Sequence, residues 1–258
     1  MFYKTIDFSK FTSIRIGQKE EVLMLELGDT APKDRYLIGH GNNLLISPTP
    51  PPLMMLGKDF DFINLKDDIL GIGAATPTGK ILSFVKKHDI AGFEFVSKLP
   101  GSLGGMLAMN AGVKEYEIFN ILDSVCIDGL WRKKEEIEHG YRFAKLGGVA
   151  TEARFRIKHG FDTKQLESLI ALRANQPKEP SAGSLFKNPE GDHAGRLIEA
   201  VGLKGMQIGG MAWSEVHANF LVNKGYGTFS EAMELINLAK QKVQSRFGIA
   251  LQEEVKIL

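Results

Sequence analysis

The chain has 258 residues, of which 43% are hydrophobic and 24% are charged, so it is long enough to bury a sizeable core. Its 32 lysines and arginines balance 31 aspartates and glutamates, which excludes a general attraction to nucleic acid or anionic membranes. The single cysteine, Cys126, excludes an internal disulfide and a cysteine-rich metal site and fits a reducing compartment. Because the net charge is only +1, any bound anion must be held by local geometry.

The N-terminal sequence MFYKTIDFSKF lacks the basic and apolar regions of a secretion signal, so we expect a cytoplasmic protein. The longest uncharged stretch, 99–113, contains four glycines. It is shorter than the roughly 20 apolar residues that a bilayer span requires. We expect neither a membrane nor a nucleic-acid partner.

Strands are predicted in the first third of the chain. RYLIGHGNNLLI (35–46) is typical of two apolar strands around a glycine-containing turn, and FINLKDDILGIGA (62–74) of a pair of strands joined by a polar turn. Between them, PTPPP (48–52) excludes a helix or an inner strand, so we interpret it as a joint between two small units.

The middle of the chain mixes helices and strands. A helix capped by Thr78 is expected to bury Ile81, Leu82 and Val85, whereas periodicity does not decide the glycine-rich tract 90–110. The alternation of polar and apolar residues in 150–160 predicts a half-buried strand. A second helix follows, with Asp162 as its cap and Leu166 and Leu169 on one side.

The last third reads as a separate unit. Asp192 is expected to cap a short helix that ends at Gly202, and a longer helix begins near Thr228 or Ser230 and ends at Gly248. The closing LQEEVKIL (251–258) predicts a strand. Because helices and strands do not alternate strictly, the fold class is α+β.

Two segments resemble nucleotide-binding motifs but lack residues that those motifs require, and no segment has the spacing of a metal site. GIGAAT (71–76) has Thr76 where a dinucleotide fingerprint needs its third glycine, so it is interpreted as a strand end. GAATPTGKI (73–81) has the wrong glycine spacing for a phosphate-binding loop. The histidines show no second ligand at metal spacing, so no metal is expected.

Two glycine-rich loops remain as candidate ligand sites. In IGHGNNLLI (38–46), the glycines expose backbone amides and the asparagines add neutral donors. In LPGSLGGMLAMNAG (99–112), a Pro-Gly turn and a possible serine cap precede a Gly-Gly pair, which leaves room for a flat group or for a phosphate at a helix start. Either loop alone is more typical of a simple chain turn, but the two together suit a ligand with two phosphates and an extended body.

A third candidate, PSAGSLFKNP (180–189), places Ser181 and Ser184 beside Lys187 and Asn188. No serine of the chain lies between glycines two residues away on each side, so Ser184 is not the nucleophile of an α/β-hydrolase. For Ser184 without further context, a turn or helix cap is the simpler interpretation.

These segments together resemble the UDP-N-acetylenolpyruvoylglucosamine reductase family. The resemblance runs from Thr12 to the last residues and rests on these motifs: TSIRIG (12–17), IGHGNNLLI, GFEFVSKLPGSLGGMLAMNAG, GYR (140–142), QPKEPSAGSLFKNP (176–189), AGRLIEAVGLKG, SEVHANFLVN and LQEEVKIL. It implies a two-part FAD-binding domain of the PCMH/vanillyl-alcohol-oxidase-like kind, at 1–52 and 53–175, followed by a smaller α+β substrate-binding domain at 176–258. The spacing is similar to the shorter of the family's two types.

The resemblance implies reduction of UDP-N-acetylglucosamine enolpyruvate to UDP-N-acetylmuramate by NADPH through FAD. This is a cytoplasmic step of bacterial peptidoglycan synthesis, and a monomer is expected. The implied acid is Ser184, while Arg142 and Glu254 stabilise the enediolate. An arginine suits this charge because its guanidinium grips a carboxylate bidentately. A glutamate there must be neutral to donate a hydrogen bond, so we expect a protonated Glu254 in the working complex.

The implied ligand contacts fall into two groups. The cofactor-binding residues are Gly39, Gly41, Asn42, Asn43, Leu44, Pro100, Gly101, Ser102, Gly104, Gly105 and Asn110. The substrate-binding residues are Lys187, Asn188, His217 and Asn219.

The chain departs from the family pattern at three positions, which affects the expected site geometry. Asn42 replaces a usual serine, Lys98 a usual glycine and Ala144 a usual serine. Two other readings stay open: an FAD-dependent oxidase of the same fold, and a flavin or nucleotide-binding module without catalysis. The response of the flavin colour to the sugar nucleotide without oxygen separates these readings.

Overall fold

The computed structural model describes residues 1–172 and 175–258, and contacts sort the chain into two compact units. Unit 1 comprises Met1–Lys4, Val22–His40 and Pro52–Ala174; unit 2 comprises Thr5–Glu21, Gly41–Pro51 and Asn175–Leu258. Both units are discontinuous in sequence, and one change of unit falls within the proline-rich 48–52 segment. The three consecutive domains expected from the sequence stay a prediction.

Unit 1 contains a five-stranded antiparallel sheet in the order β11-β10-β14-β7-β6. Its strands are β6 (Ile63–Lys66), β7 (Ile69–Gly73), β10 (Leu122–Ile127), β11 (Leu130–Lys133) and β14 (Ala150–Arg156). In β14, Ala153 and Phe155 are buried while Arg154 and Arg156 are exposed, so the predicted half-buried strand is confirmed. The predicted pair β6 and β7 is also confirmed.

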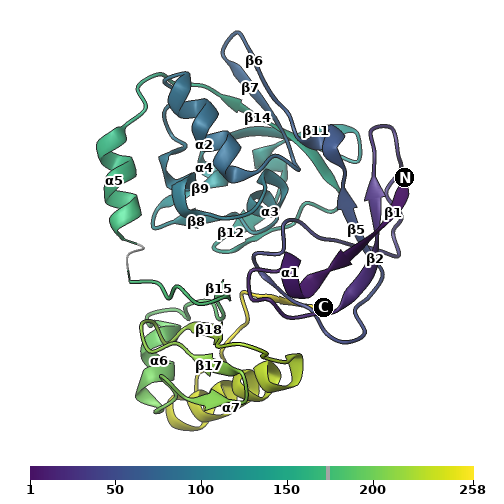
Figure 1. The fold of residues 1–258 in the computed structure, drawn as a ribbon. Helices are drawn as coiled ribbons and strands as arrows, with labels where there is room; N and C mark the ends of the chain where they lie inside the picture. The colour runs from purple at the N-terminus through teal and green to yellow at the C-terminus, as the bar shows by residue number, and fades with distance from the viewer. Residues whose placement is uncertain (173–174) are drawn as a thin grey trace. The chain divides into compact units, whose positions relative to one another are not determined.

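Helices cover one face of this sheet (Figure 1). They are α2 (Thr78–Lys87), α3 (Leu103–Ala108) and α4 (Ile118–Ile121). Their apolar sides share one core with the sheet, in which Ile81, Leu103 and Phe119 are almost inaccessible to solvent. Each such side chain contributes roughly 1.5 to 3 kcal/mol through its burial. This core fixes α3, and therefore the glycines at its start, against the end of β7.

Further elements of the first two thirds of the chain lie outside this sheet and its three helices. A second sheet has the order β1-β2-β5-β3, in which β5 pairs in parallel with both β2 and β3. The bounds are β1 (Phe2–Asp7), β2 (Lys19–Leu25), β3 (Tyr36–Leu37), β5 (Leu53–Leu56), β8 (Gly112–Val113), β9 (Tyr116–Glu117), β12 (His139–Gly140), β13 (Phe143–Ala144) and α5 (Thr163–Ala171), with 3-10 turns η1 (Lys58–Phe60), η2 (Glu94–Lys98) and η3 (Lys134–Glu136).

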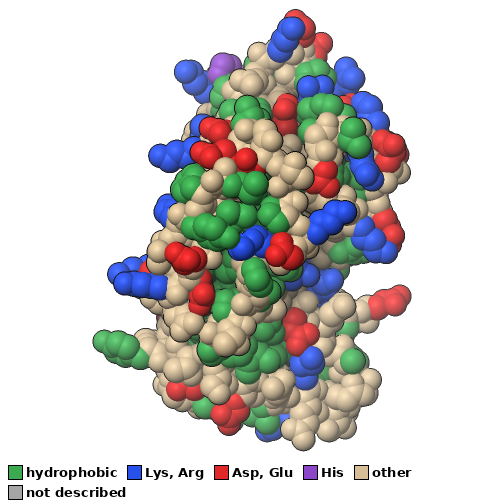
Figure 2. Space-filling view, turned by 90° about the vertical axis from the view of Figure 1, so that its right-hand side faces the viewer, with side chains coloured by type: hydrophobic (Ala, Val, Ile, Leu, Met, Phe, Trp, Pro, Cys, Tyr) green, Lys and Arg blue, Asp and Glu red, His purple; other side chains and the backbone are tan. Residues whose placement is uncertain are grey.

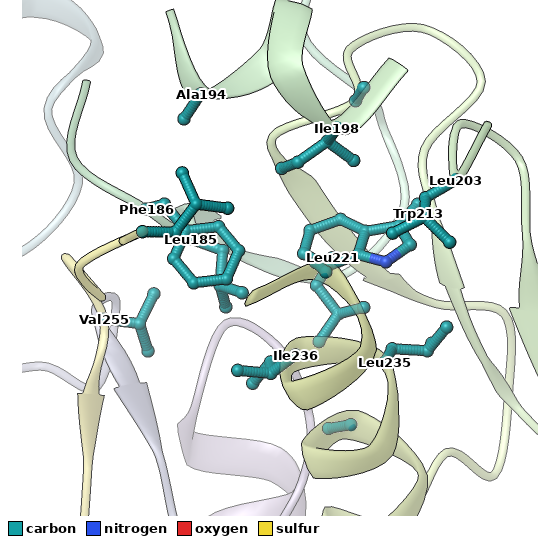
Figure 3. Close-up of a cluster of buried hydrophobic side chains, with 14 of the residues drawn as sticks. Leu185, Phe186, Ala194, Ile198, Leu203, Trp213, Leu221, Leu235, Ile236 and Val255 are labelled. Carbon is teal, nitrogen blue, oxygen red and sulfur yellow. The ribbon is translucent and has the colours of Figure 1, made fainter. Parts of the chain in front are cut away.

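Unit 2 packs two helices against a four-stranded antiparallel sheet in the order β15-β18-β17-β16. Its elements are α1 (Phe8–Phe11), β4 (Leu44–Leu45), β15 (Ser181–Ser184), α6 (Ala194–Ala200), β16 (Gln207–Ile208), β17 (Met211–Trp213), β18 (Phe220–Asn223), α7 (Phe229–Phe247) and β19 (Lys256–Ile257). Figure 3 shows the core between the sheet and the helices, where Phe186 and Trp213 lie among Ile198, Leu221 and Ile236.

Local sequence rules place several helix ends correctly. Thr228 caps α7 in a reciprocal arrangement with Glu231, and Gly248 ends the helix with a left-handed φ of 70°. Asp162 caps α5 by accepting hydrogen bonds from the amides of Lys164 and Gln165, although the reciprocal capping box that the sequence suggested with Gln165 does not form. These predicted ends are confirmed.

Other predicted ends are wrong. Thr78 is the first residue of α2 and Pro77 occupies the cap position, because the proline ring favours the extended conformation found there. His193, rather than Asp192, is the cap residue of α6. The closing strand is also shorter than predicted: only Lys256–Ile257 form β19, and Glu253 is joined to Phe186 by an isolated bridge.

One face of the protein illustrates the balanced composition. On the face shown in Figure 2, basic and acidic side chains are mixed with hydrophobic ones. Across the described ranges 1–172 and 175–258, no helix is long and apolar enough to cross a membrane.

Candidate active site

A cavity of about 320 Å³ lies within unit 1, where the first glycine-rich loop meets the start of α3. Its volume falls in the usual range of small-ligand sites, and most of its wall is apolar. Four of the predicted cofactor-binding residues line it together: Gly39, Ser102, Gly104 and Gly105. The remaining wall consists of Tyr36, Leu37, Ile38, His40, Met55, Leu56, Ala74, Ala75, Ala108, Ala144, Leu146, Gly148 and Ala150.

A close backbone approach explains the glycine at position 104, but not the glycine at position 39. A Cβ atom at Gly39 would lie 3.4 Å from the hydroxyl oxygen of Ser102. A Cβ atom at Gly104 would lie 3.1 Å from the carbonyl oxygen of Ala74. The spacing at Gly104 is tight, so a larger residue there would push α3 away from the backbone after β7, whereas the spacing at Gly39 is an ordinary contact with a side-chain atom.

The backbone amides at the start of α3 are partly engaged by the protein. The amide of Leu103 donates to the carbonyl of Thr76 at 3.0 Å, and the amide of Gly104 donates to the carbonyl of Ala74 at 2.8 Å. Ser102 occupies the cap position, but its hydroxyl makes no capping hydrogen bond, and it lines the cavity instead. Of the two alternatives left open by the sequence, this favours a flat group over a phosphate at the helix start.

Three other predicted cofactor residues of unit 1 lie outside the cavity lining. Gly101 has a φ of 127° and accepts a hydrogen bond from the amide of Thr78, and Pro100 precedes it on the surface. Asn110 is buried with a left-handed φ of 43°. Its side-chain nitrogen donates to the Glu117 carboxylate at 2.7 Å and to the Gly140 carbonyl at 3.1 Å, and its oxygen accepts from the Phe119 amide at 3.2 Å.

Arg142 lies in unit 1 on the turn between β12 and β13. Its φ of 60° is rare for a residue with a side chain, and such conformations cluster at functional positions. The guanidinium donates to the Gly112 carbonyl at 3.1 Å and lies 5.1 Å from the ring centroid of Tyr141. The turn therefore presents a permanently charged group next to the segment that Asn110 holds.

Ser184 and Glu254 lie on two segments of unit 2 that are distant in sequence but joined by backbone hydrogen bonds. Ser184 ends β15, and the amide of Glu254 donates to the carbonyl of the next residue, Leu185, at 2.8 Å. Two residues further on, the amide of Lys187 donates to the carbonyl of Gln252 at 2.9 Å. Ser184 and Glu254 are both partly exposed.

The rest of the first glycine-rich loop, Gly41 to Leu44, belongs to unit 2 rather than to the cavity unit. Gly41 has a left-handed φ of 70°, and its carbonyl accepts from the Ser13 amide. The Asn42 carbonyl accepts from the Ser13 hydroxyl at 3.3 Å. The Asn43 side chain donates to the Glu254 carbonyl at 3.0 Å, so this loop supports the segment that carries Glu254.

The predicted substrate residues lie in different surroundings. Lys187 is half-buried, and the exposed Asn188 accepts a hydrogen bond from the first amide of α6, at Ala194, at 3.1 Å. His217 is half-buried, and this burial lowers the pKa of its imidazole. Its Nδ1 atom accepts from the amide of Asn219 at 3.2 Å. Asn219 itself is 3% exposed.

Sequence reasoning missed most of the cavity wall. Ala74 and Ala75 follow β7 in the GIGAAT segment, which was interpreted only as a strand end. The run of small residues after a strand is a signal for close backbone approach that was available in the sequence. The contributions of Met55 and of Leu146 come from distant segments without any local signal. Among the described residues, no group of His, Cys, Asp or Glu could hold a metal ion.

Comparison with known proteins agrees with these features. Residues 176–258 match the family model of the C-terminal domain of UDP-N-acetylenolpyruvoylglucosamine reductase. Reductases of that name from Helicobacter pylori (strain ATCC 700392 / 26695) and Helicobacter hepaticus are 45% identical over 100% of both chains and 47% identical over 98% of both chains. The crystal structure of the enzyme (MurB) from Thermus caldophilus has a TM-score of 0.86 and 28% identity, covering 100% of this chain and 99% of that one.

These matches, together with the fold and the glycine-lined cavity, define a flavin-dependent oxidoreductase with the expected α+β fold. The chain belongs to the UDP-N-acetylenolpyruvoylglucosamine reductase family. The family resemblance noted in the sequence is thus confirmed.

The cavity residues fit part of FAD. A flat ring needs apolar walls and close backbone approach, which Ile38, Ala74 and Gly105 supply. Ser102 and His40 are the polar side chains near the glycines in the same wall. The wall contains no aspartate, glutamate, lysine or arginine, as expected for a ring system held by shape and a few hydrogen bonds.

Proposed function

We propose that this protein catalyses the NADPH-dependent, FAD-mediated reduction of UDP-N-acetylglucosamine enolpyruvate to UDP-N-acetylmuramate, a step of peptidoglycan precursor synthesis. The observation that carries the proposal is the 2.8 Å hydrogen bond from the Glu254 amide to the Leu185 carbonyl. It brings Ser184, the predicted proton donor, and Glu254, predicted to stabilise the enediolate, onto neighbouring segments of one unit. The full-length identity to the Helicobacter reductases supports the choice of reaction.

FAD would be held by Gly39, Ser102, Gly104 and Gly105 at the cavity, with the other predicted cofactor residues completing the site. When bound, it supplies the hydride, taken from NADPH, that adds to the outer carbon of the enol ether. The work of the protein is then to hold the substrate carboxylate and to deliver one proton.

Ser184 supplies that proton in our proposal. Its Oγ–H donates to the carbon next to the carboxylate, where negative charge has developed, and a C–H bond forms as the O–H bond breaks. A serine is a weak acid in water, but a carbanion is a much stronger base than water, so the transfer is favourable. Because Ser184 is partly exposed, the serine alkoxide can recover its proton from water.

Arg142 and Glu254 would stabilise the oxygens of the enediolate. The planar guanidinium can donate two parallel hydrogen bonds to the carboxylate. Glu254 donates a third hydrogen bond while it is protonated, since a second anion there would repel the developing charge. Lys187, Asn188 and His217 are the proposed contacts to the sugar nucleotide.

We further propose that the protein acts in the cytoplasm as a monomer. The single cysteine fits a reducing compartment, and NADPH and the nucleotide sugar are substrates of cytoplasmic metabolism.

The test is anaerobic and uses the holoenzyme. NADPH should bleach the yellow flavin, and the enolpyruvyl sugar nucleotide should restore the colour. Ser184→Ala should still be bleached by NADPH, but its colour should return about a thousandfold more slowly, since a general acid contributes roughly 10² to 10⁴ to the rate.

The matched control is Ser181→Ala, which removes a hydroxyl from the other end of the same strand. It should recover its colour at the wild-type rate. Recovery of the wild-type colour only after air is admitted would favour the oxidase reading, and bleaching without any recovery would contradict the proposed substrate.

A further inference from the structure

The side chain of Asn219 forms a clamp on the segment that follows Ser184. Its Oδ1 atom accepts a hydrogen bond from the Phe186 amide at 3.0 Å, and its Nδ2 atom donates to the Phe186 carbonyl at 2.8 Å. The backbone carbonyl of Asn219 also accepts from the Leu185 amide at 2.8 Å. Because an amide can only donate and a carbonyl can only accept, these partners fix the orientation of the side-chain amide.

The clamp lies where regular strand pairing is interrupted. Ser181 pairs with Val222 and Ser184 with Phe220, so β15 uses one residue more than β18 between these two pairs. The extra residue accompanies a left-handed φ of 85° at Gly183. Such a bulge leaves the position of the following residues less well fixed by the ladder. The Asn219 side chain supplies, after the bulge, the donor and acceptor that a neighbouring strand would otherwise provide.

The clamped residues also set the position of the Glu254 segment. The Leu185 carbonyl, on the other side of the segment, accepts from the Glu254 amide at 2.8 Å. The ring of Phe186 is fully buried, and its centroid lies 6.0 Å from that of the Trp213 ring in the same core (Figure 3). A shift of Leu185 and Phe186 would therefore move both Ser184 and Glu254.

We propose that Asn219 is a positioning residue for Ser184 and Glu254 rather than a contact to the sugar nucleotide. The proposal rests on the proposed function and changes the role that the sequence suggested for this residue. A side chain that is 3% exposed, with both polar atoms bonded to Phe186, is built to hold the backbone. A displacement of a reacting group by about 1 Å can cost on the order of a hundredfold in rate, so the clamp matters for catalysis.

Asn223, at the end of the strand that follows Asn219, offers a matched control. Asn223 is also buried, and its side chain donates to the carbonyl of Ile14 and accepts from the amides of Gly225 and Gly227. It therefore makes a comparable set of buried hydrogen bonds, but none of these is to the segment after Ser184. A general loss of stability should affect both asparagine variants, whereas a positioning effect should appear only at Asn219.

The experiment compares Asn219→Ala and Asn223→Ala as FAD-loaded proteins. Single-turnover rates are measured for flavin reduction by NADPH and for flavin reoxidation by the enolpyruvyl sugar nucleotide, each in H₂O and D₂O. For Asn219→Ala we expect reoxidation to slow by about 30-fold to 100-fold, with a larger solvent isotope effect and a nearly unchanged dissociation constant for the sugar nucleotide. Asn223→Ala should have a lower thermal midpoint but a wild-type reoxidation rate.

Asn219→Asp keeps the design informative if the alanine variant does not fold. The aspartate retains the acceptor for the Phe186 amide and loses the donor to the Phe186 carbonyl, and only its protonated form can restore that donor. Burial raises the pKa of such a carboxyl. Its reoxidation rate relative to wild type should therefore rise as the pH falls from about 8 to about 6.

Two results would overturn the proposal. One is a weaker binding of the sugar nucleotide by Asn219→Ala with an unchanged reoxidation rate, which would make Asn219 a substrate contact. The other is wild-type behaviour of both Asn219 variants. Failure of the wild-type protein to be reoxidised by the sugar nucleotide is a separate outcome that would reject the proposed function itself.

Discussion

The two units present their proposed catalytic side chains in different ways. In unit 1, Arg142 itself occupies a left-handed position with a φ of 60°, on a turn between two strands of two residues each. In unit 2, Ser184 lies at the end of a strand, and the left-handed φ of 85° falls on its neighbour Gly183. The unusual backbone thus lies on the functional residue in one unit and beside it in the other.

Each unit uses a buried asparagine next to this unusual backbone. The side chain of Asn110 holds the carbonyl of Gly140, two residues before Arg142, while that of Asn219 holds both backbone groups of Phe186, two residues after Ser184. Ser184 has a second support, because the 252–254 segment is bonded to Leu185 and Lys187. Each functional segment thus has a second support besides its asparagine: the 252–254 segment beside Ser184, and the Gly112 carbonyl and Tyr141 ring at the Arg142 guanidinium.

The largest effect in unit 1 should come from Arg142→Lys. Lysine keeps the charge but loses the planar fork that grips a carboxylate, so transition-state stabilisation falls. We expect flavin reoxidation by the sugar nucleotide to slow by about 10² to 10³, as when an oxyanion-binding donor is removed. Flavin reduction by NADPH should change less than about twofold.

The control for this variant is Arg132→Lys, at an exposed arginine of β11. It should be indistinguishable from wild type in both half-reactions. Full activity of Arg142→Lys would show that a positive charge alone suffices at this position. The left-handed turn that presents the guanidinium would then have no role in catalysis.

A smaller effect is expected from Asn110→Ala and Asn110→Gly. Both remove the hydrogen bond to Gly140 and so loosen the Arg142 turn, and we expect reoxidation to slow by about tenfold in each. Unfolding in urea should show a loss of about 2 to 3 kcal/mol for the alanine variant, because buried partners lose their hydrogen bonds. The glycine variant should regain about 1 kcal/mol of this, because glycine relieves the left-handed backbone.

This pair of variants also tests the cofactor role that the sequence suggested for Asn110. Loss of FAD binding with an unchanged rate of substrate reduction would make Asn110 a cofactor contact. The similarity with Asn219 would then be fortuitous.

The sequence predicts best what is encoded within a few residues. The hairpin of β6 and β7 and the ends of α7 at Thr228 and Gly248 follow from turn and capping rules. The start of α6 does not follow from these rules. The Ala194 amide donates to the side chain of Asn188, six residues earlier in the chain, rather than to Asp192. Capping by a distant loop residue has no local signature.

The candidate site shows the same limit. The glycine-rich loops are visible in the sequence, but it does not show that Gly39 would meet Ser102 at a cavity while Asn43 would hold the Glu254 segment. The sequence also does not show which asparagines contact a ligand and which form hydrogen bonds to the backbone, because the residue type is the same in both cases. The parallel pairing of Leu44 with Lys256 joins segments more than two hundred residues apart and is set by the tertiary fold.

The smallest effect concerns the support behind Asn219. Burial lowers the pKa of His217, so the folded protein favours the neutral imidazole, whose Nδ1 atom accepts from the Asn219 amide. Below the ordinary histidine pKa of about 6.5, the unfolded chain binds the proton more readily, and stability is lost as the pH falls through the lower pKa of the folded state. The thermal midpoint of wild type should thus fall more between about pH 7.5 and about pH 5.5 than that of His217→Gln. The difference should be small beside a typical stability of roughly 5 to 15 kcal/mol, since the imidazole is only half-buried and water screens the effect. The control is His193→Gln, at an exposed histidine, which should retain the pH dependence of the wild-type thermal midpoint. If the thermal midpoints of wild type and His217→Gln change equally with pH, the neutral imidazole of His217 does not contribute to the stability of the clamp.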